Sequence, residues 1–329
     1  MQTPMVSRRT WLAAATALLL AGGWTGPASA QSYPSRIIKV IVPFTPGSPN
    51  DVLARLLTQY LQTQLGQAII IENKPGGGTA IGTKAAAMAD PDGYTLLFIS
   101  SALVLDPVLH GRPDYDPRQD FAPIAVAATA PWVLVINPTL PAKTADEFVA
   151  YTKAKPGSVS FGYAQGTASQ FVVERFAKLT GADILSVPYK GGAAAVPDFL
   201  SDRIQMMIQT PSTSLPLIHQ NKMRAIAITS AERNPDLPDV PTMRELKLPS
   251  LTLEFWAGLF APAGTPPDII ERLNSAIGTV LRSAEMNDGL KRLGFSAKIT
   301  SSQDFSAFVG EEMPRWTDLA KSSSSSKGN

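Results

Sequence analysis

The chain has no cysteine and only two histidines among its 329 residues. Without a thiol, the protein can form no disulfide, no cysteine-ligated metal site and no thiolate nucleophile, and it has no cysteine to carry a lipid anchor. His110 and His219 are far apart and do not have metal-ligand spacing, which argues against a histidine zinc site. They also provide little material for a Ser-His-Asp triad. We therefore expect no metal, no cofactor and no catalytic residues.

The chain also has little net charge. Its formal charge is +2 at pH 7, and two of the basic residues are Arg8 and Arg9 near the N-terminus; without them, 27 basic residues balance 27 acidic ones. Nucleic-acid binding depends on clustered contacts from Lys and Arg to phosphates, so we expect no nucleic-acid partner. The length and the 44% hydrophobic content are those of a globular chain with room for two domains.

The first 30 residues have the pattern of an export signal. Arg8 and Arg9 precede an apolar run from Trp11 to Leu20, and Ala28-Ser29-Ala30 fits a signal-peptidase site. The alternative is an N-terminal membrane anchor, but a membrane span needs about 20 apolar residues. The Arg pair also resembles a twin-arginine signal, so the export route stays open. The pattern predicts cleavage after residue 30 and a periplasmic protein without a lipid anchor.

Strand and helix patterns alternate along the rest of the chain. Short apolar runs predict strands, and amphipathic helices follow them after short connections. The expected strands cover residues 37–42, 68–71, 94–99, 131–136, 159–163, 185–188, 204–208 and 225–229. Such alternation favours parallel sheets covered by helices, whose ligands bind at the carboxyl ends of the strands.

Two predicted helices begin directly after strand ends. Ser48, followed by Pro49, fits the N-cap of the first helix, and Thr167 with Gln170 has the spacing of a capping box. The first turn of a helix has unpaired N–H groups and the positive end of the helix dipole. Two such starts facing one cleft could therefore bind a carboxylate. Plain helix capping explains the same residues equally well.

Seven short blocks occur in order between residues 33 and 266. They are residues 33–47, 72–78 (Glu-Asn-Lys-Pro-Gly-Gly-Gly), 91–97 (Pro-Asp-Gly-Tyr-Thr-Leu-Leu), 115–124, 187–191 (Val-Pro-Tyr-Lys-Gly), 237–242 (Leu-Pro-Asp-Val-Pro-Thr) and 261–266 (Ala-Pro-Ala-Gly-Thr-Pro). Together they closely resemble the receptors of tripartite tricarboxylate transporters, often called Bug receptors. The resemblance implies an α/β fold of the type II periplasmic-binding-protein class, with two lobes around a central cleft joined by two crossing strands.

The resemblance also implies a domain organisation. Residues 31–130 and 251–321 are expected to form a discontinuous first lobe, and residues 131–250 a second lobe, with crossings near Ala130 and Ser250. Residues 322–329, which are rich in serine, are expected to be a flexible tail.

Candidate ligand-binding residues are carried over from the family by position. The resemblance implies that loops of both lobes hold the ligand with backbone amides, hydroxyl groups and water. The candidates are Phe44, Thr45, Gly47, Ser48, Asn50, Ser100, Ser101, Gln165, Gly166, Thr167, Ala168, Ser169, Tyr189, Gln209 and Thr210. Relatives often have glycine in place of Ser48 and histidine in place of Gln170, so contacts at these positions can differ here. Whether Lys190 or Asp51 contacts the ligand stays open.

The resemblance implies a monomeric periplasmic receptor that captures a small carboxylate and delivers it to the membrane permease subunits of a tripartite transporter. Di- and tricarboxylates, aromatic acids such as terephthalate, and amino acids all fit a neutral cleft lined with hydroxyl groups. One alternative is a receptor that reports its ligand to a two-component signalling system. A remoter alternative is an enzyme on the same scaffold.

Overall fold

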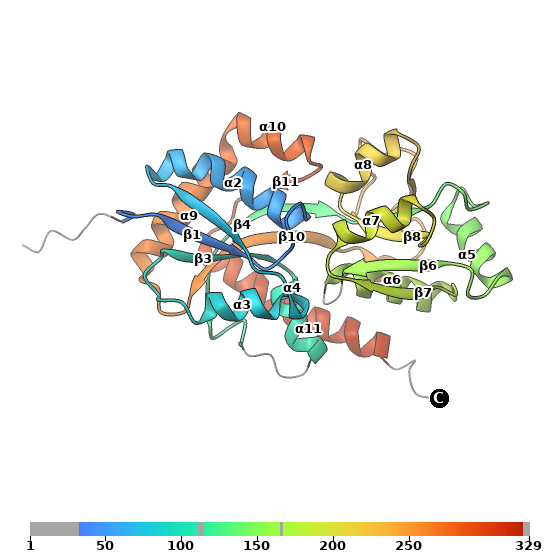
Figure 1. Cartoon of the computed structure of the whole chain (residues 1–329), viewed down its shortest axis with the longest axis horizontal. Coiled ribbons are helices and arrows are strands. Elements are labelled where there is room, and N and C mark those ends of the chain that lie inside the picture. The colour runs from blue at the N-terminus through green and yellow to red at the C-terminus, as the bar shows by residue number, and fades with distance from the viewer. Residues whose placement is uncertain (1–32, 111–114, 165–166, 325–329) are drawn as a thin grey trace, which may run out of the picture. The chain divides into compact units, whose positions relative to one another are not determined.

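The computed structural model describes residues 33–110, 115–164 and 167–324, and Figure 1 shows their helices and strands. The expected export signal, the candidates Gln165 and Gly166, and residues 325–329 of the expected tail lie outside these ranges. Within the described ranges, no helix has both the length and the apolar character needed to cross a membrane.

Six strands form the first sheet, in the order β11-β4-β10-β3-β1-β2. The strands β1, β2 and β3 are parallel, whereas β10 runs antiparallel to β3 and β4. The central strands are buried on both faces, which explains their nearly continuous apolar sequences. The bounds are β1 (Ile38–Val42), β2 (Ile69–Asn73), β3 (Thr95–Ser100), β4 (Phe121–Pro131), β10 (Glu254–Pro262) and β11 (Ser296–Ala297).

Helices cover both faces of the first sheet, as Figure 1 shows. One group comprises α2 (Pro49–Leu65), α9 (Pro267–Arg282) and α10 (Ala284–Arg292), which pack against one another. The other comprises α3 (Ala80–Ala87), α4 (Ala102–His110) and α11 (Ser302–Ser324), with the short 3-10 turn η1 (Gly77–Thr79) before α3. The apolar stripe of α9, which includes Leu273 and Ile277, is buried against the sheet. These helices enclose the core of the first lobe.

Five strands form the second sheet, in the order β7-β6-β8-β5-β9. The strand β6 is parallel to β7 and β8, and β5 is antiparallel to β8 and β9. The strands are β5 (Val133–Ile136), β6 (Ser160–Ala164), β7 (Leu185–Tyr189), β8 (Met206–Gln209) and β9 (Arg224–Ile228), and the helices are α5 (Ala145–Ala154), α6 (Ala168–Thr180), α7 (Gly192–Leu200) and α8 (Pro211–His219). A 3-10 turn, η2 (Pro249–Leu251), precedes the return to the first sheet.

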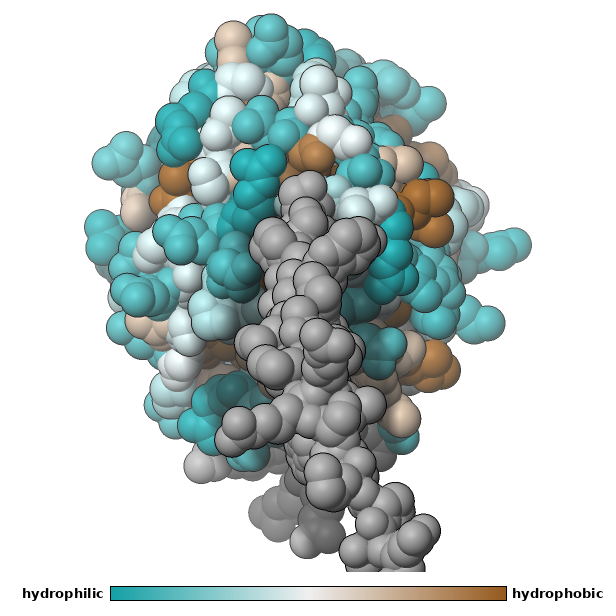
Figure 2. Space-filling model, turned by 90° about the vertical axis from the view of Figure 1, so that its left-hand side faces the viewer, coloured by the Kyte–Doolittle hydropathy of each residue, from teal (hydrophilic) through white to brown (hydrophobic). Residues whose placement is uncertain are grey.

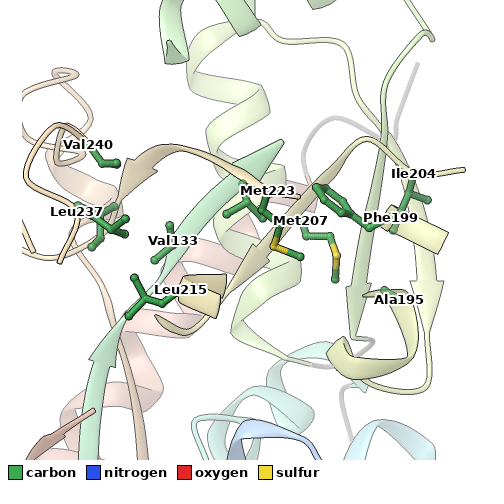
Figure 3. Packing of buried hydrophobic residues seen from close by; sticks show 11 residues of the cluster. Val133, Ala195, Phe199, Ile204, Met207, Leu215, Met223, Leu237 and Val240 are labelled. Atoms are coloured by element: carbon green, nitrogen blue, oxygen red, sulfur yellow. The ribbon is translucent and has the colours of Figure 1, made fainter. Parts of the chain in front are cut away.

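A cluster of buried hydrophobic side chains forms part of the core of the second lobe (Figure 3). Val133 and Met207 come from β5 and β8, and Phe199 comes from α7. Phe199, Met207 and Val133 are fully enclosed, so the helices and the sheet are held together mainly by apolar burial.

The sheets are mixed rather than wholly parallel, which corrects the expectation from the alternating pattern. The chain leaves the first sheet along β4, which ends at Pro131, and enters the second sheet along β5, which begins at Val133. Because only Trp132 separates them, β5 enters the second sheet from the side at which β6 and β8 end, and so runs against β8. Of the strand expected over residues 131–136, residues 133–136 form β5, whereas Pro131 is the last residue of β4 in the first sheet.

Thr229 holds together the two segments that connect the sheets. Its N–H donates to the carbonyl oxygen of Trp132 over 2.9 Å, and its carbonyl oxygen accepts from the N–H of Leu253 over 3.1 Å. Trp132 lies in the outgoing connection and Leu253 in the returning one. The architecture is thus the two-lobed α/β fold expected for a type II periplasmic binding protein.

The exact lobe limits at residues 130/131 and 250/251 stay a prediction. The helix α11 continues to Ser324, so it includes residues 322–324, which we expected to belong to the tail.

Figure 2 views the side of the molecule formed by the first lobe. On its uncovered part, hydrophobic residues lie in small groups among hydrophilic ones, as on an ordinary water-facing surface.

Candidate ligand-binding cleft

A cleft of about 490 Å³ lies at the strand ends of both sheets. This volume is within the range of sites that bind small molecules. The residues that we predicted and that line it are Phe44, Thr45, Ser48, Asn50, Ser100, Ser101, Thr167, Ala168, Ser169, Tyr189 and Gln209. Gly47 and Thr210 were also candidates but do not line the cleft. The structure therefore brings together residues that are up to 165 positions apart in the sequence, from Phe44 to Gln209.

The topology explains why these residues meet. The parallel strands β1 and β3 end at Val42 and Ser100, and the loops that follow both line the cleft. In the second sheet, β6, β7 and β8 end at Ala164, Tyr189 and Gln209, which also line it. The carboxyl ends of parallel strands lie at one edge of a sheet, and here the two edges border the same cleft.

The start of α2 forms part of the first-lobe wall. Ser48 has extended backbone angles, and its Oγ accepts from the N–H of Asp51 over 3.3 Å, as expected for an N-cap. Pro49 occupies the first helical position. Asn50 is 4% exposed, and its Oδ1 has no hydrogen-bond partner in the described structure.

The segment from Gly76 to Thr79 also belongs to this wall, and our sequence prediction missed it. Gly76, Gly77, Gly78 and Thr79 all have positive φ angles, and that of Thr79 is 96°. A residue with a Cβ rarely adopts such an angle, and strained residues of this kind cluster at binding sites. The buried hydroxyl of Thr79 has no partner in the described structure. The run of three glycines was the available signal, because only glycine adopts these angles freely.

The start of α6 forms part of the second-lobe wall. Thr167 has the backbone angles of an N-cap, but its side chain does not cap the helix. Its hydroxyl donates to the carbonyl oxygen of Ala164 over 2.8 Å and lies 2.6 Å from Ser169 Oγ. The side chain of Gln170 donates to Glu174, so the predicted capping box is wrong. Within the described part of the chain no side chain caps this helix, and the N–H of Gln170 donates to the carbonyl oxygen of Thr167 over 3.2 Å. The start of α6 can therefore offer the N–H groups that precede Gln170 to an anion.

Two aromatic residues also line the cleft: Trp132 lies in the connection between the sheets, and Phe255 is near the start of β10. The rings of Trp132 and Phe255 are T-shaped, with centroids 5.5 Å apart and an angle of 85° between their planes. Trp132 is 7% exposed, and its Nε1 has no hydrogen-bond partner in the described structure. We missed both residues: Trp132 falls within the strand expected over residues 131–136, and no element was expected around Phe255.

Lys190 is the one charged side chain among the described residues that line the cleft. Asp51 does not line it: its carboxylate accepts from Gly47 N–H, Arg55 Nε and Asn73 Nδ2. Burial would raise the pKa of Asp51, but these hydrogen bonds outweigh burial and hold the pKa below its ordinary value. A cleft whose one charged side chain is positive favours anions over cations.

Tyr189 lines the cleft, but its hydroxyl is already occupied. It donates to Asp198 over 2.8 Å, and Arg203 donates to the same carboxylate. Burial raises the pKa of the Tyr189 hydroxyl, and the hydrogen bond to Asp198 raises it further. The phenol is therefore a fixed structural donor, and Tyr189 can offer a ligand mainly the face or edge of its ring.

The described residues contain no group of three or more His, Cys, Asp or Glu side chains that could hold a metal ion. His219 is the last residue of α8 and is not part of the cleft lining. The groups that the cleft offers are hydroxyls, amides and the start of α6, which no side chain caps in the described structure. These groups can bind an anion by hydrogen bonding.

Comparison with known proteins decides the family. A sequence model of the tripartite tricarboxylate transporter family receptor matches residues 53–324. The chain belongs to this receptor family. BugT of Bordetella pertussis is 37% identical to the chain over 302 residues, which cover 91% of the chain and 93% of BugT. The resemblance predicted from the ordered sequence blocks is thus confirmed, and the family consists of solute-binding receptors rather than enzymes.

Solved structures of the receptor family have the same fold. A protein of R. palustris with adipate aligns with a TM-score of 0.85 and 31% identity, covering 88% of this chain and 98% of that protein. MatC of Rhodopseudomonas palustris with bound malate aligns with a TM-score of 0.81 and 32% identity, covering 88% and 100%. Each of these two structures is of a protein together with a carboxylate, adipate in the first and malate in the second.

Proposed function

We propose that this receptor captures a small carboxylate in the cleft and delivers it to the permease subunits of a tripartite transporter. One observation carries the proposal: hydroxyl groups and helix starts from both lobes line a single cleft whose described lining contains no acidic side chain. An anion in such a site gains hydrogen bonds from backbone N–H groups at helix starts. The carboxylates bound to two family members support this class of ligand.

The proposal includes export to the periplasm. Residues 1–30 would direct secretion and be removed after Ala30, leaving a receptor that is not attached to the membrane. The receptor would then collect its ligand between the two membranes of the cell envelope and carry it to the permease as a monomer.

Binding would work through movement of the lobes about their two connections. A ligand that contacts both walls favours the closed arrangement by its greater affinity for that arrangement. The walls already approach closely at one point, because a Cβ added to Gly191 would lie 2.9 Å from Thr45 Oγ1. Closure excludes water from the ligand and so strengthens each hydrogen bond to its carboxylate. The closed surface is the form that the permease would recognise.

A thermal-shift screen with purified protein tests the proposal. The panel contains citrate, malate, adipate, terephthalate, nicotinate and glutamate, with glucose and putrescine as an uncharged and a cationic control. At a hundredfold excess over Kd, a true ligand stabilises the folded state by about 2.7 kcal/mol, which gives a visible shift. Stabilisation by at least one acid and by neither control supports the proposal. Stabilisation by putrescine or glucose alone would contradict it.

Two variants then locate the site. Replacing Ser101 or Thr167 with alanine removes a hydroxyl from one wall of the cleft without adding bulk. Loss of the Ser101 hydroxyl as a donor to a charged ligand is expected to weaken binding by about 1.5–3 kcal/mol. Thr167→Ala is expected to weaken binding by loosening the start of α6, because the Thr167 hydroxyl donates its one proton to Ala164. Ser275→Ala, in a helix that does not contribute to the cleft, is the control. Unchanged affinity in both cleft variants would show that the acid binds elsewhere.

A further inference from the structure

We infer that Asn73, which does not line the cleft, is a positioning residue that holds one wall of the cleft in the form that binds ligand. The part of the wall that it holds is the first cleft loop, which comprises residues 43–48 between β1 and α2. Most residues of this loop line the cleft. The inference rests on the proposed capture of a ligand there, but it does not depend on which acid binds.

The first sheet places Asn73 beside the first cleft loop. The strands β1 and β2 are parallel, and their last residues, Val42 and Asn73, are partners in the register. The N–H of Lys74 donates to the carbonyl oxygen of Val42 over 2.9 Å, so the two chains stay paired to this point. The first cleft loop begins directly after Val42. A side chain at the end of β2 can therefore reach the loop that follows β1.

The side-chain amide of Asn73 joins the first cleft loop to α2. Its Nδ2 donates to the carbonyl oxygen of Phe44 over 3.1 Å and to Asp51 Oδ1 over 2.9 Å. Its Oδ1 accepts from Arg55 over 3.0 Å. The amide thus uses both its donor and its acceptor side, and no other side chain of this size offers both. This pattern of bonds fixes the orientation of the amide.

Asp51 extends the same restraint to the other end of the first cleft loop. Asp51 is 3% exposed, and its carboxylate accepts from the N–H of Gly47 over 2.9 Å. The same carboxylate accepts from Asn73, which therefore helps to orient it. The loop is held at Phe44 by Asn73 directly and at Gly47 through Asp51.

The point at which the two walls of the cleft approach lies within the held loop. Thr45 stands between Phe44 and Gly47, and its Oγ1 would lie 2.9 Å from a Cβ added to Gly191 of the second lobe. A loop that samples several positions must be ordered when the lobes close on a ligand, and this ordering reduces affinity. Loss of the Asn73 amide is therefore expected to weaken ligand binding, although Asn73 is not part of the cleft lining.

Isothermal titration calorimetry with matched variants tests the inference. The probes are malate and adipate, with the other acids of the screening panel as substitutes. Asn73→Ala is expected to weaken binding about fivefold to tenfold. Asn274→Ala is the control, because the Asn274 amide also bridges two acceptors, the carbonyl oxygens of Ile124 and Thr300, but does not contact the first cleft loop. It is expected to change affinity less than about twofold.

Urea unfolding of both variants shows whether they lose similar stability, as the loss of two hydrogen bonds in each predicts. A difference in affinity between variants of similar stability cannot come from general destabilisation.

Two further measurements separate positioning from a general structural role. Asp51→Asn also loosens the first cleft loop, so the affinity losses of Asn73→Ala and Asp51→Asn are expected to be less than additive in the double variant. In the protein without ligand, the N–H of Gly47 is expected to exchange its hydrogen about tenfold faster in Asn73→Ala. Its exchange rate should stay unchanged in Asn274→Ala.

The outcomes distinguish this inference from the proposed function. If Asn73→Ala binds the acid as tightly as the unaltered protein, or if Asn274→Ala loses as much affinity, the inference is wrong and the carboxylate receptor remains supported. Unchanged exchange at Gly47, or fully additive affinity losses in the double variant, would also overturn it. If no acid of the panel binds, the proposed function is wrong, and the exchange measurement decides whether Asn73 holds the loop.

Discussion

The hydroxyl of Thr229 accepts a hydrogen bond from the backbone N–H of Trp132 over 2.8 Å, at the point where the chain passes from the first sheet to the second. The same hydroxyl donates to the carbonyl oxygen of Leu253 in the returning connection. Thr229 is fully buried, so these groups have no access to water. One side chain thus links the two connections between the sheets.

Thr229→Val is therefore expected to destabilise the protein. The substitution keeps the shape but leaves a buried N–H and a buried carbonyl oxygen without the hydroxyl, at a cost of about 1–3 kcal/mol. Urea unfolding measures this loss. Thr229→Ser keeps the hydroxyl and is the matched control, with a smaller loss from the missing methyl group. Equal losses in both variants would show that the hydroxyl contributes nothing.

Trp132 and Trp256 provide a second matched comparison. The indole N–H of Trp256 donates to Glu312 over 2.9 Å, whereas that of Trp132 has no partner in the described structure. Trp256→Phe removes a hydrogen bond to a buried carboxylate and is expected to cost about 1.5–3 kcal/mol more than Trp132→Phe. Chemical denaturation of both variants measures the difference. Similar losses would imply that Trp132 also has a partner when the protein is in solution.

Asp51 is expected to make stability depend on pH in the acid range. Burial alone would raise the pKa of the Asp51 carboxyl in the folded state. Hydrogen bonds from Arg55, Gly47 and Asn73 outweigh burial and hold this pKa below the ordinary value of 3.8. The stabilisation is therefore complete above the unfolded-state pKa and is lost as the pH falls through the lower folded-state pKa. Asp51→Asn should cost about 1–3 kcal/mol near neutral pH, and its difference from the unaltered protein should shrink in acid.

Urea unfolding at a series of pH values measures the Asp51 effect. Asp288→Asn is the control, because Asp288 is an exposed residue on α10. A difference between Asp51→Asn and the unaltered protein that stays constant down to strong acid would contradict the argument.

Gly191→Ala tests whether the walls of the cleft must approach each other. The added methyl group would lie 2.9 Å from Thr45 Oγ1, so the threonine side chain or the lobes must shift. Overpacking of this kind is expected to cost about 1 kcal/mol, or roughly a fivefold loss of ligand affinity. Gly310→Ala is the control: it has open space around it on α11, and should raise stability by about 0.5–1 kcal/mol. Equal ligand affinity in both variants would show that binding does not need this contact.

The sequence predicted those parts of the fold and site that depend on local patterns. The strands β1, β3 and β6 appeared as apolar runs, and Ser48 caps α2 as its sequence suggested. Polar residues after strand ends, such as Ser101, line the cleft because parallel strands end at one edge.

Other features depend on partners that are distant in the sequence. Thr167 has the sequence of a capping residue, but its hydroxyl donates to Ala164 and lies beside Ser169. Trp132 lies within the strand expected over residues 131–136, and only the pairing of β4 and β5 with different sheets shows that it borders the cleft.

A crystal structure of the protein with the acid that binds most tightly in the screen tests the central claim most directly. We predict that the carboxylate accepts hydrogen bonds from both walls of the cleft, from the region of Ser101 in the first lobe and the start of α6 in the second. An acid bound at another surface, with the cleft holding only water, would contradict the account.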